Sequence, residues 1–422
     1  MRGSKTGLEV RIRNEKNPGL LDIDRDICHH IHNASKKFCS SFGEHVENLF
    51  DDVFNDHRWS PDLHEFFNEI CEIIGQAPTA PERFVRHRWL SCYDLSISML
   101  RVFDAYWLFY YAFLSSAEKT SYRDILDEII GRYNISSHDM TVVKKIWADL
   151  KAKQKTLTPE GRKRKDRIVD KIIYKEKETR LTLNFYVAVL PLLKEYVLLF
   201  QNRRPLVHRL HERQENLMRN FLSCFMKAEN TKVSSAQLLN PSLISEESML
   251  NRKDLFIGKA RKIVETMSAN DILITEFYKK VEQAYYQCAL YLQKKLPLNN
   301  DLLRAASSLD PSLQHNVKLS LLKKLKAHVR HFLSEEEQSS YDLEVHHFMV
   351  DMSLPSFDEE KEDPDRIDKW WACVKRRNQY PSLCKVALTL CTVFHGPLVS
   401  VALFLLCVHF FICRKNSLGL EL

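Results

Sequence analysis

Four residues near the N-terminus have the types and the close spacing of metal ligands. Cys28, His29 and His30 are consecutive, and His32 follows two residues later. Thiolates and imidazoles bind Zn²⁺, but structural zinc sites take four ligands, usually in paired spacings such as CxxC or HxxxH. Such a pair is missing nearby. We therefore expect a helix start with one or two packed histidines rather than a zinc site, and we expect no metal or cofactor.

A dense basic run at residues 161–167 is the second candidate for chemistry. Its cations are Arg162, Lys163, Arg164, Lys165 and Arg167. Runs of this kind act as nuclear import signals or contact the phosphates of nucleic acids. They also occur on solvated helix starts. All three interpretations stay open from the sequence of the run itself.

Other catalytic motifs are missing from the sequence. There is no nucleophile elbow, P-loop or GxGxxG, and 10 Gly in 422 residues argue against phosphate-binding loops. The 11 Cys include no CxxC pair, which is typical of a reduced compartment. The net charge of +7 permits contact with nucleic acid or an anionic membrane and requires neither. The sequence thus offers none of these catalytic motifs, and we expect no small-molecule substrate.

Apolar spacing predicts that helices must position these residues. We expect helices at about 28–50, 61–74, 89–115, 121–153 (two), 162–201 (one long helix or two in line), 204–227, 246–268, 270–295, 314–333 and from Asp368 onward. Pro191 should kink or break the 162–201 run. The clearest strand candidate is 19–23, and the acidic stretch 353–367, with two prolines, is the best linker.

Four segments together resemble hAT-type transposases, and in particular their domesticated vertebrate derivatives. They are the Cys/His-Asn segment 28–34, the Arg-Trp pair in 88–91, the Leu-Asp-Pro block in 303–311, and the segment from Trp370 to Pro397. Each motif alone is weak, and their shared order along the chain carries the resemblance.

The resemblance implies an RNase H-like catalytic core interrupted by a large helical insertion. Such a core holds three carboxylates around two divalent metals for phosphoryl transfer. The first two acids of the family would fall at or before Met1, and the third position is Ser400 here. We therefore expect no catalytic residue in this chain and a catalytically inactive protein.

The resemblance also implies roles for aromatic residues. The family's tryptophan at the Arg88-Trp89 position stacks on a displaced DNA base, although a core Trp beside an exposed Arg is the alternative favoured here. Trp370, Trp371 and Tyr380 lie in the region similar to the family's dimerisation region, and simple core packing explains them equally well.

The expected fold is mainly α, with a degenerate fragment of an RNase H-like α/β core and a large helical insertion. The expected domains are a core remnant (1–115), the helical insertion (116–352), an acidic linker (353–367) and a C-terminal block ending in an apolar tail (368–413). The expected function is that of a transposon-derived nuclear protein that acts through protein or DNA contacts, with self-association as one such contact.

Two apolar stretches bear on an alternative function, that of a membrane-tethered helical protein. Residues 181–200 have the length of a membrane span, but Lys194 and Glu195 lie inside and favour a buried helix. The tail from Leu398 to Cys413 has sixteen residues, just under the roughly 17–25 that span a bilayer. A membrane anchor and a helix docked on a protein core fit this tail equally well.

The tail alternative predicts a specific effect of a central charge. Leu405→Arg should cost an inserted helix roughly 2.5–3.5 kcal/mol and release a folded protein from membranes. On a packed core the same charge should aggregate the C-terminal block. Carbonate extraction of cells that express the wild-type chain is the first measurement. A protein that washes off with the soluble fraction contradicts the membrane anchor.

Overall fold

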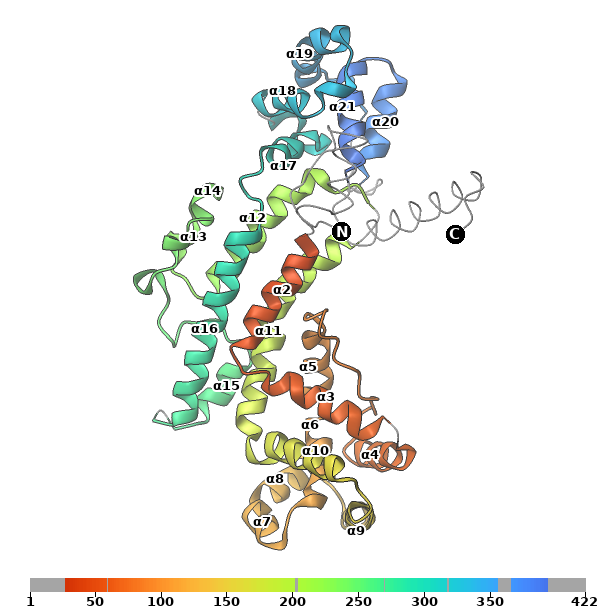
Figure 1. The fold of residues 1–422 in the computed structure, drawn as a ribbon, viewed down its shortest axis with the longest axis vertical. Helices are drawn as coiled ribbons and strands as arrows, with labels where there is room; N and C mark the ends of the chain where they lie inside the picture. The colour runs from red at the N-terminus through yellow and green to blue at the C-terminus, as the bar shows by residue number, and fades with distance from the viewer. Residues whose placement is uncertain are drawn as a thin grey trace, which may run out of the picture. The chain divides into compact units, whose positions relative to one another are not determined.

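The computed structural model describes residues 27–58, 60–201, 204–268, 270–316, 319–355 and 366–393. The described residues form helices and turns, and their one β-type pairing is an isolated bridge between Met226 and Met249. The expected mainly α fold is confirmed (Figure 1). The strand candidate at 19–23, most of the 353–367 linker and the tail residues Leu398, Leu405 and Cys413 lie outside the described residues.

The chain splits into two compact units. Unit 2 comprises His32–Lys194 and Leu250–Ala289, and unit 1 comprises the described residues of Met1–Ile31, Glu195–Met249 and Leu290–Leu422. These units come from spatial contacts, whereas the expected domains follow the family resemblance, which stays a prediction.

Unit 2 is built from helices that each bury an apolar face. Their bounds are α2 (Ile27–Ser40), α3 (His45–His57), α4 (Pro61–Ile73), α5 (Ser91–Arg101), α6 (Phe103–Tyr110), η1 (Tyr111–Phe113), α7 (Ser116–Ser121), α8 (Arg123–Tyr133), α9 (Ser137–Gln154), α10 (Pro159–Val169), the π-helical turn η2 (Asp170–Tyr174), α11 (Glu176–Phe200), α15 (Ala260–Glu265) and α16 (Ile272–Lys295). The division between the units falls inside α2, α11 and α16, which therefore belong in part to unit 1. Every side chain of α6 is buried, and α10 packs against α3 and α6 (Figure 1).

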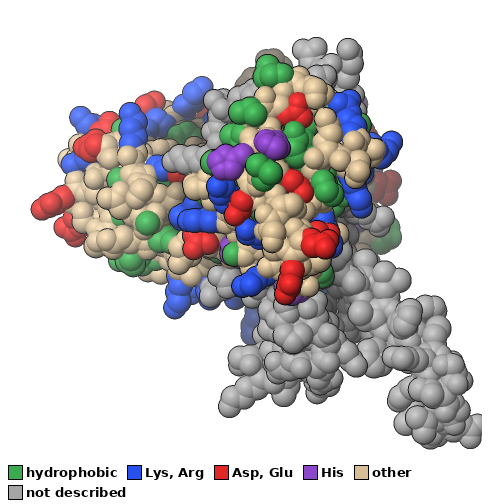
Figure 2. All heavy atoms as spheres, turned by 90° about the horizontal axis from the view of Figure 1, so that it is seen from above, with side chains coloured by type: hydrophobic (Ala, Val, Ile, Leu, Met, Phe, Trp, Pro, Cys, Tyr) green, Lys and Arg blue, Asp and Glu red, His purple; other side chains and the backbone are tan. Residues whose placement is uncertain are grey.

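Unit 1 has its own apolar core. Its remaining helices are α12 (Val207–Ser223), α13 (Ala228–Thr231), α14 (Ser235–Leu238), η3 (Pro241–Leu243), η4 (Glu246–Ser248), α17 (Asp301–Ala306), η5 (Ser307–Leu309), η6 (Pro311–Asn316), α18 (Leu319–His328), η7 (Arg330–Phe332), α19 (Glu335–Val350), α20 (Ile367–Arg376) and α21 (Pro381–Cys391). The core forms where α19 and α20 pack against α21 and α17 packs against α18. Figure 2 looks down on the end of this unit, where described apolar, basic and acidic side chains are interspersed.

Two expected helices are interrupted by turns that the apolar spacing did not predict. The 28–50 helix breaks between α2 and α3, where Gly43 (φ 65°) and Glu44 (φ 56°) adopt the left-handed conformation. The 89–115 helix is α5, α6 and η1 in succession. The 162–201 run, expected as one long helix or two in line, is two helices in line, with an interruption at Lys175 directly after the π turn. The expected break at Pro191 is not found, because α11 continues through this residue. Proline removes one backbone hydrogen bond, and the buried side chains around Pro191 offset that loss.

The expected helix at 246–268 was wrong over most of its length. It contains η4, turns and the short α15. At Gly258 (φ 54°) the backbone comes so close to α11 that an added Cβ would lie 2.3 Å from the Cβ of Ala188. Because only glycine permits that approach, the turn is fixed by packing rather than by local helix preference. The other expected helices agree with α4, α8, α9, α12, α16, α18, α20 and α21 to within a few residues.

Among the described residues, α11 is the helix that is long and apolar enough, by length and composition, to cross a membrane. Half of its most apolar window is buried within the protein. Core helices of soluble proteins pass the same test, so the finding is weak evidence for a membrane span. The helix supplies several fully buried side chains to unit 2, including Phe185 and Tyr186.

Candidate nucleic-acid contact surface

The positive charge of the chain is concentrated in α9 and α10. Residues 144–167 contain ten Lys and Arg against three Asp and Glu, a net charge of +7 that equals the net charge of the whole chain. We call residues 144–167 the basic segment. Both of its helices have strong local start signals. Ser136 forms a capping box with Asp139, and Thr158 accepts a hydrogen bond from the Gly161 backbone N–H beside Pro159 at the first turn.

A buried ion pair ties the basic segment to α3. The Nζ of Lys165 lies 2.7 Å from an Oδ of Asp56, and the two side chains are only 4% and 5% exposed. The Tyr110 hydroxyl donates to the same Oδ at 2.9 Å. The Lys165 ammonium also lies 4.6 Å from the ring centroid of Phe113. Removal of either charge would leave the other one buried and unpaired, which is the costly case.

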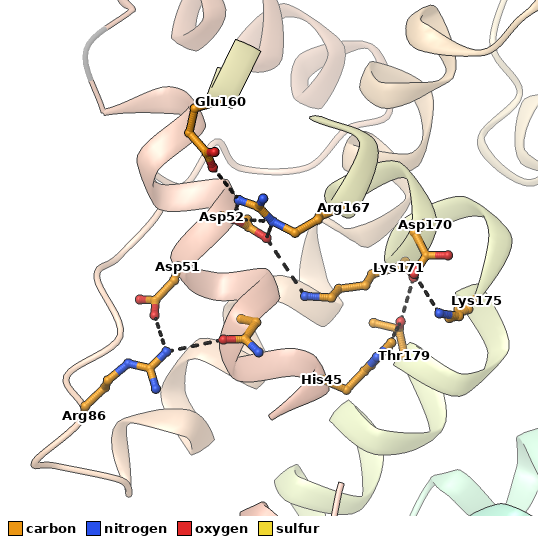
Figure 3. A network of polar contacts seen from close by, with 11 residues as sticks. His45, Asp51, Asp52, Arg86, Glu160, Arg167, Asp170, Lys171, Lys175 and Thr179 are labelled. Carbon is orange, nitrogen blue, oxygen red and sulfur yellow. Dashed lines mark hydrogen bonds and ion pairs between the residues drawn. The ribbon is translucent and has the colours of Figure 1, made fainter. Parts of the chain in front are cut away.

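A second, partly exposed network extends from this anchor (Figure 3). The Arg167 guanidinium donates through Nη2 at 2.7 Å and Nε at 3.0 Å to the two Oδ atoms of Asp52, and through Nη2 to Glu160 at 3.2 Å. This two-point contact holds the pKa of Arg167 above its ordinary value. Lys171 lies 4.0 Å from Asp52 as well. Arg167 is therefore committed to α3 and is a poor candidate for a ligand contact.

Two further cations of the run reach backbone carbonyls. Arg164 donates through Nη1 to the Asn55 carbonyl at 3.0 Å, and Arg162 donates through Nε to the Leu157 carbonyl at 3.2 Å. Each of these bonds uses one of the five N–H groups of a guanidinium, so both residues keep donors for a phosphate. Lys163 is exposed and makes no ion pair with the residues that the structure describes.

The sequence predicted that Arg162, Lys163, Arg164 and Lys165 bind nucleic acid. This prediction is corrected for Lys165, because its ammonium is in the core. The exposed cations of the segment that make no ion pair within the described chain are Lys144, Lys145, Lys151, Lys155, Arg162 and Lys163. Four of them lie outside the basic run that the sequence drew attention to. The sequence indicates these four lysines only when the charges of α9 and α10 are counted together, because they belong to no single motif.

Arg88 lies on the surface and Trp89 lies in the core, as the favoured packing alternative predicts. Arg88 is exposed, whereas Trp89 is 3% exposed and packs edge-to-face on Phe84, with ring centroids 5.3 Å apart. The Lys36 ammonium lies 5.6 Å from the Trp89 ring centroid. A buried ring cannot stack on a base unless it leaves the core, so the position of Trp89 supports the packing role that was favoured and not the base contact that the resemblance implies.

The three aromatic residues expected at a dimer contact are in the core of unit 1. Trp371 is fully buried and donates its indole N–H to the Leu309 carbonyl at 3.0 Å, and the Tyr380 hydroxyl donates to Asp351 at 2.7 Å. Trp370 packs edge-to-face on Trp371, at 5.0 Å between centroids. Because these side chains already have intramolecular partners, self-association stays a prediction that they do not support.

The histidines near the N-terminus do not form a group of metal ligands with Cys28. Cys28 is buried, His29 is exposed, and the Nδ1 of His30 lies 3.1 Å from the Tyr291 hydroxyl. The group of three potential metal ligands found among the described residues is Cys39, Glu47 and Cys92, and it includes neither Cys28 nor His32. The spacing along the chain does not predict this group, because its members come from three helices.

Comparisons with known proteins leave the family undecided. Neither the scan against protein-family models nor the searches of curated proteins and of solved structures found a match to this chain. The hAT resemblance and its RNase H-like core therefore stay predictions.

The two faces of α10 predict unequal effects of neighbouring substitutions. Lys165→Ala leaves Asp56 buried without its cation and should destabilise the protein by about 3–5 kcal/mol. Lys163→Ala, on the exposed face, should change the free energy of unfolding by no more than about 0.5 kcal/mol. Urea unfolding followed by circular dichroism measures both. Equal effects of the two variants would contradict the buried ion pair.

Proposed function

We propose that this chain is a transposon-derived, non-catalytic nuclear protein that contacts the phosphate backbone of nucleic acid through the basic segment. The observation that carries the proposal is the concentration of the chain's net positive charge in 24 residues, six of whose cations are exposed and unpaired within the described chain. Cations of this kind release counterions from DNA when they contact phosphates. Such binding is strong at low salt and largely independent of base sequence.

The arrangement of α10 favours a phosphate contact over a linear import signal. An import receptor that binds the run as one basic stretch would have to extract Lys165 from its buried pair with Asp56. A phosphate backbone needs only the cations on the exposed face, which remain available while the helix is folded. The nuclear location itself rests on the family resemblance.

The proposal assigns no reaction to the chain. The family's third acid would fall at the position of Ser400, so this carboxylate ligand of the two metals is not expected here. The membrane-tethered alternative rests on the apolar sequence from Leu398 to Cys413 alone. Carbonate extraction, described above, separates it from the nuclear proposal.

The salt dependence of DNA binding tests the phosphate contact. The variant Arg162→Ala/Lys163→Ala should bind duplexes of unrelated sequence equally weakly, because phosphate contacts carry no sequence information. Its slope of log K against log salt should be smaller than that of the wild type by about 0.9 for each lost contact. Fluorescence anisotropy over a series of salt concentrations gives both quantities.

A matched control uses two exposed lysines of the same unit that lie outside the basic segment. Lys253→Ala/Lys259→Ala removes the same charge and should leave the slope unchanged. If both double variants lower the slope equally, the binding follows net charge alone and the assignment to the basic segment is wrong. If the wild type does not bind duplex DNA at low salt, the proposed function itself fails.

A further inference from the structure

Three buried side chains in unit 2 converge from three different helices. Cys39 lies near the end of α2, Glu47 in the first turn of α3 and Cys92 in the first turn of α5, and none of them is exposed to solvent. One ligand atom from each lies within 4.8 Å of the other two. The Sγ of Cys92 is 4.0 Å from an Oε of Glu47. We call these three residues the Cys2Glu cluster.

The carboxyl of Glu47 is poorly satisfied by the protein alone. One oxygen, Oε1, accepts hydrogen bonds from the Tyr186 hydroxyl of α11 at 2.9 Å and from the Cys92 thiol at 4.0 Å. The other oxygen, Oε2, is buried and has no hydrogen-bond partner. Tyr186 has one hydroxyl hydrogen, which is shared with the Cys39 carbonyl 3.1 Å away. A buried carboxylate in this position lacks an ion-pair partner among the described residues, and such groups are rare unless a cation compensates them.

Burial also affects the protonation of the cluster. Loss of solvent raises the pKa of Glu47 to about 7 and raises the pKa of both thiols above the ordinary range. Burial of the unpaired Oε2 of Glu47 also lowers the stability of the fold, because a buried acceptor without a hydrogen bond carries a desolvation penalty. An apolar residue of similar size would fill the same space without this penalty.

We infer that Cys39, Glu47 and Cys92 form a structural binding site for a thiophilic divalent cation of the Zn²⁺ type. Two thiolates and a carboxylate are an established ligand chemistry for zinc, at about 2.3 Å for sulfur and 2.0–2.2 Å for oxygen. Tetrahedral geometry at those lengths places the ligand atoms about 3.5–3.8 Å apart, so the cluster needs only a small contraction. The unpartnered Oε2 of Glu47 supplies either the third bond or, with Oε1, a two-oxygen contact that fills the fourth position.

The remaining contacts fit a closed structural site. Tyr186 would act as a positioning residue, since its hydroxyl holds the ligating carboxylate, as outer hydrogen bonds do in zinc proteins. On binding, the two thiols lose their protons to solvent and the cation takes their place, which makes affinity fall as the pH is lowered. The ion would join α2, α3 and α5 at one point. The inference is independent of the proposed DNA contact, which uses other residues.

The test uses the full chain, purified under reducing conditions, stripped with a chelator and titrated with Zn²⁺ or Co²⁺. We expect one equivalent of zinc by elemental analysis, and with Co²⁺ we expect a thiolate-to-cobalt charge-transfer band together with the visible bands of a tetrahedral ion. A wild-type chain that binds neither ion in a chelator competition overturns the inference. A cobalt spectrum without the thiolate band overturns it as well, because binding would then be elsewhere.

Variants locate the site. Cys39→Ser and Cys92→Ser should each abolish the thiolate spectrum or weaken zinc binding by at least about 100-fold, and Tyr186→Phe should weaken it by about 10–100-fold. The matched controls Cys71→Ser and Cys384→Ser alter equally buried cysteines outside the cluster and should bind as the wild type does. Circular dichroism shows whether each variant folds. If Cys39→Ser does not fold, the milder Tyr186→Phe decides, and unchanged affinity in that variant contradicts the inference. Equal losses in the controls contradict it too.

Discussion

The pair formed by Lys165 and Asp56 is the interaction on which the arrangement of the basic segment depends. Two opposite charges are removed from water between α10 and α3, and such burial costs several kcal/mol per ion before the partner compensates it. The compensation comes from a short contact, from the Tyr110 hydroxyl on the same carboxylate and from the ring of Phe113. Once this pair is fixed, the orientation of α10 about its own axis is fixed as well. The helix then has one face of cations committed to the protein and another face that is free to meet a ligand.

Helix α3 supplies the acidic partners for much of unit 2. Asp56 meets Lys165, Asp52 meets Arg167 and Lys171, and Glu47 lies between two cysteines and a tyrosine. The first two acids are balanced by cations of the protein itself. Glu47 is the exception, and its second oxygen has no partner. The proposed DNA contact uses exposed cations that have no acidic partner in the described chain. The proposed metal site uses a buried acid, Glu47, that has no cationic partner there.

The sequence predicted what depends on neighbouring residues along the chain. Helices such as α4 and α9 followed from apolar spacing, and so did the mainly α fold. The sequence could not predict where tertiary contacts interrupt a helix, as at the turn where Gly258 packs against Ala188. The π turn before Lys175 also left no signal in the apolar spacing.

The functional residues show the same limit. Arg162 and Lys163 were predicted as exposed cations and are exposed, whereas Lys165 was assigned to the same surface and is buried. A clue existed, because Lys165 lies three and four residues before the buried Ile168 and Val169 and so shares their helix face. The acid that makes burial tolerable is 109 residues away in the chain, and no spacing rule connects the two. Cys39, Glu47 and Cys92 escaped notice for the same reason.

The central claim is that one short segment of a folded helical protein carries the contact with nucleic acid. Hydrogen–deuterium exchange of the full chain, with and without duplex DNA at low salt, tests it most directly. The account predicts slower exchange on DNA binding in peptides from residues 141–167, with peptides of α18 to α21 unchanged. Protection confined to other helices, or equal protection throughout the chain, would contradict the account.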